Sequence, residues 1–201
     1  MPDTPHNRRP LMLETARLKL RQWRPEDRAP FAALNADPEV MAYFPHRLSQ
    51  SQSDRLADQC EALINEHGWG FWALERQQSG DFLGFVGLHM PDAALPFSPC
   101  VEIGWRLAAR YWGQGYATEA AMAALSVGFT TLGLAEIVSF TAVSNRRSRA
   151  VMERLGMVPD PQTFNHPALA EDSPLRRHCL YRLSAREWAR TTHPETLPKI
   201  Y

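Results

Sequence analysis

Residues 110–117 read RYWGQGYA and place two glycines, Gly113 and Gly115, directly before an alanine-rich segment typical of a helix. The alternating apolar residues of 101–107 come just before them and predict a strand. At a helix start, free backbone N–H groups and the helix dipole attract an anion, and glycine lets a phosphate approach closely. The order strand, glycine turn and helix therefore predicts an anion-binding loop. The alternative is a tight connection that needs glycine for its backbone alone.

Two common phosphate-binding patterns do not fit this loop. A Walker A loop needs Gly-Lys followed by Ser or Thr, and the segment has none. A dinucleotide-binding loop reads GxGxxG with an acid at the end of the next strand. Here Thr118 occupies the third glycine position, and Glu136 lies at the beginning of its strand. Both readings are therefore rejected.

A second cluster of polar residues lies at 145–149, which reads NRRSR at the expected start of a helix. Positive charge is unfavourable at this end of a helix. An anion bound by Arg146, Arg147 or Arg149 would compensate for it, and a solvated arginine cluster is the alternative.

The elements that position these residues can be read from apolar periodicity. Strands are expected near 16–23, in a hairpin over 69–91, and at 101–107, 136–143 and 176–184, with helices at 49–66, 116–132 and 148–155. Pro25 and Pro38 each precede acidic residues and mark two short helix starts. Residues 159–174 contain four prolines and are expected to form an irregular loop. This order predicts an α/β fold with one mixed sheet covered by helices.

Composition limits the class of protein. The 201 residues predict one domain spanning 1–201, with a core at about 13–189 and two tails. The formal net charge is zero, so no basic field favours nucleic acid or a membrane surface. No apolar run reaches the ~20 residues of a membrane span. The three cysteines are far apart in the sequence, which favours a reducing cytoplasm. No residues have the spacing of metal ligands, so no metal site is expected.

Residues 102–157 resemble the GNAT superfamily of acyl-CoA-dependent N-acetyltransferases, most closely its RimJ/RimL-like branch. Arg110, Gly113 and Gly115 match the family's pyrophosphate loop, and Asn145, Ser148 and the segment ERLGM match a second motif. With the hairpin and the first strand, the resemblance covers about residues 13 to 184. It implies a mostly antiparallel, twisted sheet of about seven strands flanked by helices.

The resemblance implies acetyl-CoA as the acyl donor. The pyrophosphate would lie on the amides of the glycine loop, and the pantetheine arm would follow the strand at 103–107. There a splayed strand end would expose a backbone N–H near Trp105 to polarise the thioester carbonyl. The cofactor-binding residues expected on this basis are Ile103, Trp105, Leu107, Arg110, Gly113, Gln114, Gly115, Ala117, Asn145, Arg147 and Arg149.

Two residues are the candidates for proton transfer. Glu102, beside the expected pantetheine site, is the candidate general base, with a structural carboxylate as the alternative. Many family members carry a tyrosine acid where this chain has Met152. The RimJ/RimL-like resemblance instead implies the hydroxyl three residues after the asparagine, so Ser148 is the candidate proton donor, with a helix-capping role as the alternative. The segment 165–178 is expected to border the acceptor, and Glu171 or Asp172 would bind or deprotonate an amine there.

The sequence therefore predicts an N-acetyltransferase that moves acetyl from acetyl-CoA to a primary amine, either a protein N-terminus or a small molecule. The alternative function is a non-catalytic acyl-CoA-binding module. Neither nucleic acid nor a membrane is an expected partner, and a homodimer stays open.

Overall fold

The computed structural model describes residues 9–91, 94–191 and 198–201. Its strands form one sheet in the order β7-β8-β6-β5-β4-β3-β2-β1-β9. Every neighbouring pair is antiparallel except β5 and β6, which are parallel. The expected mixed, mostly antiparallel sheet is confirmed. Nine strands replace about seven because the two-residue strands β1 and β9 extend one edge.

The elements follow one another in the order expected for a strand-rich first half and an alternating second half. They are β1 (Leu13–Glu14), β2 (Leu18–Arg21), η1 (Pro25–Asp27), α1 (Arg28–Ala36), α2 (Gln50–His67), β3 (Phe71–Arg76), β4 (Phe82–His89), β5 (Glu102–Leu107), η2 (Ala109–Tyr111), α3 (Tyr116–Ser126), the π-helical turn η3 (Val127–Thr131), β6 (Glu136–Ala142), α4 (Arg146–Arg154), β7 (Val158–Asn165), β8 (Arg177–Ser184), α5 (Ala185–Thr191) and β9 (Lys199–Ile200).

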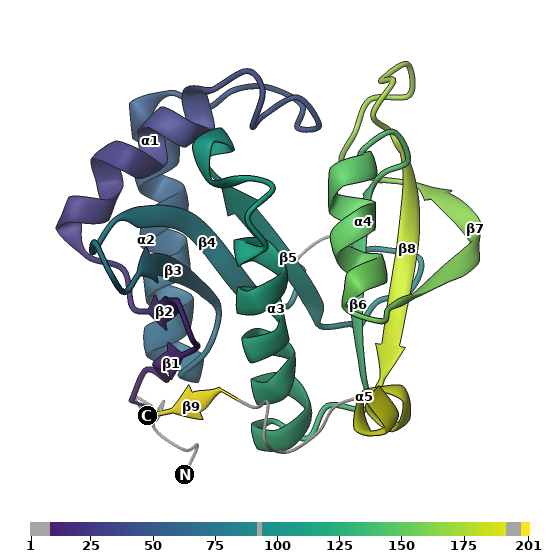
Figure 1. Cartoon of the computed structure of the whole chain (residues 1–201). Helices are drawn as coiled ribbons and strands as arrows, with labels where there is room; N and C mark the ends of the chain where they lie inside the picture. The colour runs from purple at the N-terminus through teal and green to yellow at the C-terminus, as the bar shows by residue number, and fades with distance from the viewer. Residues whose placement is uncertain (1–8, 92–93, 192–197) are drawn as a thin grey trace, which may run out of the picture.

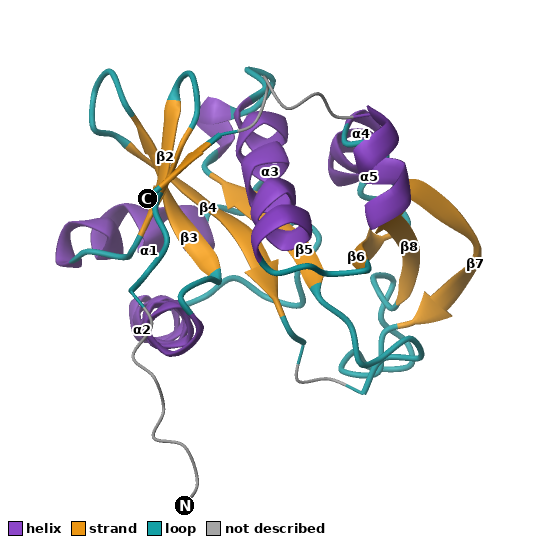
Figure 2. Ribbon diagram, turned by 90° about the horizontal axis from the view of Figure 1, so that it is seen from below, coloured by secondary structure: helices purple, strands orange, loops and turns teal. Residues whose placement is uncertain are grey.

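The helices form a layer on each face of the sheet. Helices α3, α4 and α5 lie on one face, and α1 and α2 lie on the other (Figures 1 and 2). The strands β5 and β6 lie behind α3 and α4 in Figure 1 and move apart toward their carboxyl ends. The two strands therefore separate on the side of the sheet where the glycine loop and α4 both begin.

Local signals explain why α2 begins and ends where it does. The Ser49 side chain accepts from the Gln52 N–H while the Gln52 side chain accepts from the Ser49 N–H, which is a capping box. Gly68 closes the helix with φ at 83°, a conformation that glycine adopts without strain. The helix expected at 49–66 is confirmed.

Two expectations about proline-rich segments are wrong. The helix start at Asp37 is absent, since α1 ends at Ala36 and residues 38–43 form turns that stop before Pro45. A residue before proline avoids the helical region, which explains the stop. The loop expected at 159–174 begins as strand β7, whose prolines are tolerated because it is an edge strand.

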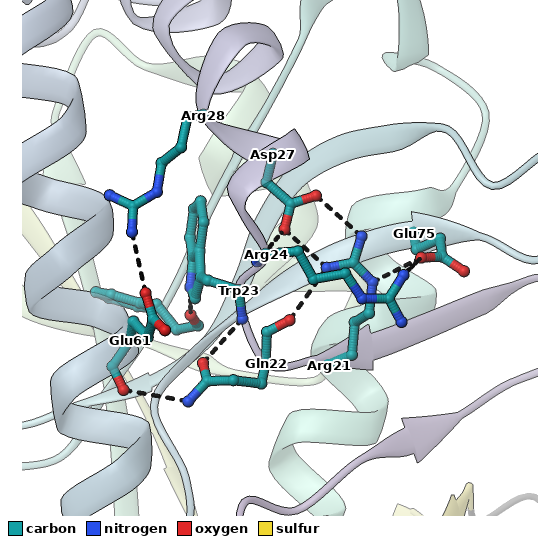
Figure 3. Close-up of polar contacts among 9 residues, drawn as sticks. Arg21, Gln22, Trp23, Arg24, Asp27, Arg28, Glu61 and Glu75 are labelled. Atoms are coloured by element: carbon teal, nitrogen blue, oxygen red, sulfur yellow. Dashed lines mark hydrogen bonds and ion pairs between the residues drawn. The ribbon is translucent and has the colours of Figure 1, made fainter.

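Ion pairs join the turn η1 to the sheet and α1 to α2 (Figure 3). Arg21 on β2 donates to both oxygens of Asp27 at 2.7 and 2.9 Å and to Glu75 at 2.6 Å. Arg28 of α1 donates to Asp58 and Glu61 of α2. Arg21 is buried, and its two carboxylate partners compensate the cost of removing its charge from water. The pairs of Arg28 are partly exposed.

Candidate functional site

The gap between β5 and β6 is the central feature of the site. Glu102 and Val138 form the only register pair between these two strands, and the Ser139 hydroxyl donates to the Ile103 carbonyl at 2.9 Å. Val101 and Ile103 therefore direct their backbone groups toward β6. Trp105 is next in this alternation, and no β6 residue in its register faces it. The strand separation implied by the resemblance is present, and the Trp105 N–H points into it.

The three candidate residues of β5 differ in what they offer. The side chains of Ile103 and Leu107 are buried in the core, so they can contribute only backbone groups. The Ile103 carbonyl is occupied by Ser139, and the Leu107 carbonyl accepts from the Trp112 indole at 2.9 Å. Among these residues, Trp105 has the backbone donor that remains available.

Glu102 is a carboxylate that no described residue pairs with. It lies where β5 and β6 separate, and within the described residues no hydrogen bond or ion pair holds its side chain. Burial raises the pKa of Glu102 from 4.5 to about 7. The cause is desolvation alone, since a charged carboxylate loses its hydration without gaining a compensating cation. Such a group exchanges protons near neutral pH.

The glycine loop presents a row of backbone donors. The N–H groups of Gly115, Tyr116, Ala117 and Thr118 have no hydrogen-bond acceptor in the part of the chain that is described, and the first helical bond comes from Glu119 to Gly115. Gly115 has φ at 81°, and a Cβ added at Gly113 would meet nothing within 4 Å. These amides at a helix start, with open space beside them, suit a diphosphate.

Side chains around the loop hold it in place. Arg17 donates to Glu119 at 2.6 Å and to the Gln114 carbonyl at 3.0 Å, and it lies over the Tyr116 ring. The Gln114 amide donates to the Arg110 carbonyl at 3.0 Å, while the Arg110 guanidinium lies over the neighbouring Tyr111. An open pocket lined by Ala16, Arg17, Arg76, Gln77, Gln78 and Tyr116 adjoins the loop.

Arg17 was missed by sequence reasoning. It occupies a polar position of the alternating first strand segment, where an arginine is ordinarily a solvated residue. Its contact with Glu119 spans 102 residues of sequence, and no local pattern announces such a contact.

Asn145 and Ser148 form the N-terminal cap of α4. The Asn145 carbonyl oxygen accepts from the Ser148 N–H at 3.2 Å, and its amide nitrogen donates to the Ser148 hydroxyl at 3.1 Å and to the Thr141 hydroxyl at 3.0 Å. The capping alternative for these residues is thus realised. The Ser148 oxygen accepts a hydrogen bond there, so its own proton stays available to an acceptor in the gap.

The arginines of α4 point to two different places. Arg147 forms an exposed ion pair with Glu39 at 3.1 Å and lies over the Trp112 ring, so it reaches the glycine loop. Arg149 instead donates to the Val143 carbonyl at 3.2 Å and to the Tyr181 hydroxyl at 3.3 Å. Arg149 is therefore held on the β8 side of the helix, away from the loop.

An aromatic cluster lies on the sheet face that carries Glu102. Phe140 is on this face, two residues beyond the partner of Glu102, and it packs with rings of other segments. The cluster consists of Phe97, Phe140, Phe164, His166 and His178. Burial lowers the pKa of both histidines. Segment 165–178 therefore contributes rings beside the gap.

The two acidic candidates of that segment are poorly suited to proton transfer. Glu171 and Asp172 are exposed, and Glu171 lies 3.7 Å from Arg176. Neither is desolvated as Glu102 is.

Two kinds of feature are absent from the described residues. No cluster of three or more His, Cys, Asp or Glu side chains could hold a metal ion there. Nor does any helix in these residues combine the length and apolar character needed to cross a bilayer.

Comparison with known proteins agrees with this geometry. Residues 17–158 match the model of the acetyltransferase (GNAT) domain. The chain is 34% identical over 146 residues to the uncharacterized protein YkkB of Bacillus subtilis, covering 72% of this chain and 84% of YkkB. It is 31% identical over 195 residues to the FsC-acetyl coenzyme A-N(2)-transacetylase of Aspergillus fumigatus, covering 90% of this chain and 80% of that enzyme.

A solved structure supports the same assignment. The acetyltransferase of Agrobacterium tumefaciens superposes with a TM-score of 0.70 at 27% identity, covering 91% of this chain and 99% of that one. The chain belongs to the GNAT family and is an acetyl-CoA-dependent acyltransferase.

Proposed function

We propose that this protein transfers the acetyl group of acetyl-CoA to a primary amine by direct attack of the amine nitrogen. The observation that carries the proposal is Glu102, a desolvated and unpaired carboxylate at the point where β5 and β6 separate. An ammonium group must lose a proton before it can attack, and a carboxylate whose pKa is about 7 accepts that proton near neutral pH.

The residues of the gap fit the donor. Acetyl-CoA, when bound, supplies an activated thioester. The free amides from Gly115 to Thr118 would hold its diphosphate, and Arg147 adds a positive charge beside them. The Trp105 N–H would donate to the carbonyl oxygen, which gains negative charge during the reaction.

Two proton movements accompany the transfer. Glu102 takes the proton that the amine nitrogen releases, and the sulfur that leaves needs one in return. The Ser148 hydroxyl would supply it, because its oxygen already accepts from Asn145 and its proton has no acceptor within the described residues.

An amine acceptor agrees with the name of a relative. The Aspergillus fumigatus enzyme is an N(2)-transacetylase, so it acts on nitrogen. The RimJ/RimL-like resemblance favours a protein N-terminus, and a small-molecule amine is the other acceptor class. We also propose a cytoplasmic location, because the three separated cysteines favour a reducing compartment.

A non-catalytic acyl-CoA-binding module is the second candidate. The observation that favours it is Met152, which stands where many family members have a tyrosine and is only 1% exposed, packed in the core. No hydroxyl is present at that position.

Thiol release from acetyl-CoA, measured with a panel of primary amines, tests the two candidates. Amine-dependent release supports the enzyme. Binding of acetyl-CoA by calorimetry without release on any amine would instead support the module.

A further inference from the structure

Arg106 is a half-buried cation of β5 with an incomplete set of partners among the described residues. It lies four residues after Glu102, so both side chains are on the same face of the sheet. Its Nη1 donates to Asn35 of α1 at 2.7 Å, and the fully buried Asn35 donates in turn to Ser53 of α2 at 2.9 Å. The guanidinium is therefore held in a defined orientation.

Two aromatic rings hold the same group. The Arg106 Cζ atom lies 4.1 Å from the centroid of Phe44, which belongs to the segment between α1 and α2, and 5.4 Å from that of Phe85. These rings attract the cation but accept no strong hydrogen bond. Phe44 and Asn35 thus fix the guanidinium without neutralising it.

One edge of the guanidinium has no partner. Nε is buried and makes no hydrogen bond. Nη2 also has no acceptor among the described residues. Unlike Nε, it is not buried, so it reaches solvent. Nε and Nη2 share the edge that binds a carboxylate side-on through two parallel hydrogen bonds.

Arg21, which is buried, shows how the chain treats such a charge when it is structural. Arg21 is paired with Asp27 and Glu75, whereas no carboxylate of the described residues pairs with Arg106. Burial lowers the pKa of Arg106 to about 10. An uncompensated cation of this kind is costly in a folded chain, and a bound anion would remove the cost.

We propose that Arg106 binds a carboxylate of the acetyl acceptor, while the amine of the same molecule lies at Glu102. The inference rests on the proposed function and adds the class of acceptor to it. The Cα atoms of residues four apart in a strand are separated by roughly 13 Å. Phe71 lies over Gly104 between them, 3.1 Å from where a Cβ would be. The acceptor is therefore an amino acid whose amine and carboxylate are separated by an apolar spacer.

The same geometry disfavours polyamines. A second ammonium group in place of the carboxylate would meet the Arg106 cation in a desolvated position. Charge repulsion there is weakly screened by salt, so diamines of matched length should be poor acceptors.

The test compares three acceptor series of matched chain length: ω-amino acids, n-alkylamines and diamines. For each, kcat/KM is measured with acetyl-CoA. We expect an ω-amino acid of optimal length to exceed the alkylamine by roughly tenfold to hundredfold, as a charged hydrogen-bonded pair contributes. Arg106→Met should reduce this ratio to about one. Arg106→Lys should keep part of it, because lysine keeps the positive charge but cannot form the two parallel hydrogen bonds of a guanidinium.

Controls separate binding from folding. Arg186→Met removes an exposed arginine of α5 and should keep the wild-type ratio. Acetyl-CoA affinity, measured by calorimetry, reports whether each variant is folded. Succinyl-CoA serves as a second donor, because a carboxylate on the acyl group is another source of the same chemistry.

The other outcomes show whether the carboxylate site alone or the proposed function as well is wrong. Equal turnover of amino acids and alkylamines, a preference for diamines, or a carboxylate preference that survives Arg106→Met overturns the inference alone. A loss of succinyl-CoA use in Arg106→Met, with the acceptor ratio unchanged, also overturns it by assigning the carboxylate to the donor. No turnover of any amine, with acetyl-CoA bound, overturns the proposed function and this inference with it.

Discussion

The guanidinium of Arg147 lies over the indole ring of Trp112, with 4.5 Å between its Cζ atom and the ring centroid. This contact joins the start of α4 to the loop before α3, two segments that are 35 residues apart in the numbering. It places an exposed charge at the glycine loop, where Glu39 is its other partner. An anion arriving at those amides competes with Glu39 for Arg147.

Loss of Arg147 should therefore weaken binding of CoA. If Arg147 meets the 3′-phosphate, Arg147→Ala raises the dissociation constant of CoA more than that of dephospho-CoA, which lacks this phosphate. Arg149→Ala is the comparison, because its bonds to Val143 and Tyr181 predict a loss of stability with no preference between the ligands. Calorimetry with both ligands measures the difference. Equal losses in Arg147→Ala would leave that residue as surface charge.

A negative charge at the glycine loop should oppose the diphosphate. Gln114→Glu changes an exposed, nearly isosteric side chain beside the free amides of α3. We expect the dissociation constant of acetyl-CoA to rise roughly fivefold to thirtyfold, with the effect shrinking at high salt. Thermal stability should stay equal or rise slightly, since acids favour a helix start. Gln114→Met controls for loss of the amide, and an unchanged constant in Gln114→Glu would argue against this loop.

Substitution of the glycines is a less direct test. Gly113 has φ at 73° and Gly115 has φ at 81°, so any Cβ strains the backbone whether or not a ligand is present. Weaker binding in Gly113→Val would thus combine strain with the loss of space, which is why the exposed glutamine is preferred.

The rate of the enzyme should depend on Glu102 and on pH. A general base acts in its deprotonated form, so the wild-type rate should rise with pH through about 7. Glu102→Gln should lower kcat by roughly 10² to 10⁴ and flatten this rise, with little change in acetyl-CoA affinity. Glu66→Gln, an exposed change on α2, is the control. Full activity of Glu102→Gln across pH would direct the search to Glu171 and Asp172, or to an amine that arrives neutral.

The same carboxylate should make the fold less stable as pH rises from 4.5 to about 7. The folded-state pKa of Glu102 is raised from 4.5 to about 7, so in this range the folded state binds more protons than the unfolded state. The free energy of unfolding therefore falls as pH rises through the range, by up to roughly 3 kcal/mol for this group. Urea unfolding should show Glu102→Gln gaining stability relative to wild type between pH 4.5 and 7. If the difference in the free energy of unfolding between Glu102→Gln and wild type did not change with pH, the Glu102 carboxyl would be hydrated in the folded state.

Ser148 should matter most when the leaving thiolate is basic. Ser148→Ala removes the proposed proton donor and the acceptor of one Asn145 bond, at a stability cost of about 1 kcal/mol. The loss of rate should shrink with acyl donors whose thiols are more acidic, because a better leaving group needs less protonation. A series of acyl thioesters measures this trend, and a uniform loss across the series would assign Ser148 to capping alone. Met152→Tyr should restore little of the lost rate. Met152 is buried, so a tyrosine ring at this position would overpack the core.

The local parts of the site could be predicted from sequence. The strand, glycine loop and helix around Gly113, and the cap at Asn145, follow from signals within a few residues of each other. The environment of Arg106 could not, because Asn35 and Phe44 come from segments more than 60 residues away. In the sequence, Arg106 is only a polar position of an alternating strand.

The burial of Glu102 was beyond sequence reasoning for a similar reason. Its raised pKa depends on tertiary packing that removes water, while its place in the strand would suit a solvated residue equally well. Strand β7 was missed because proline count argues for a loop unless the strand is known to lie at an edge.

The two outermost strands are poorly suited to pairing with a strand of another copy. Pro159 and Pro161 on β7 have no N–H to offer a further strand, and β9 at the opposite edge is only two residues long and carries Lys199. Natural sheets use such features to prevent edge-to-edge aggregation. A dimer of this protein would therefore be built from helices and loops, and both sheets would remain separate within it.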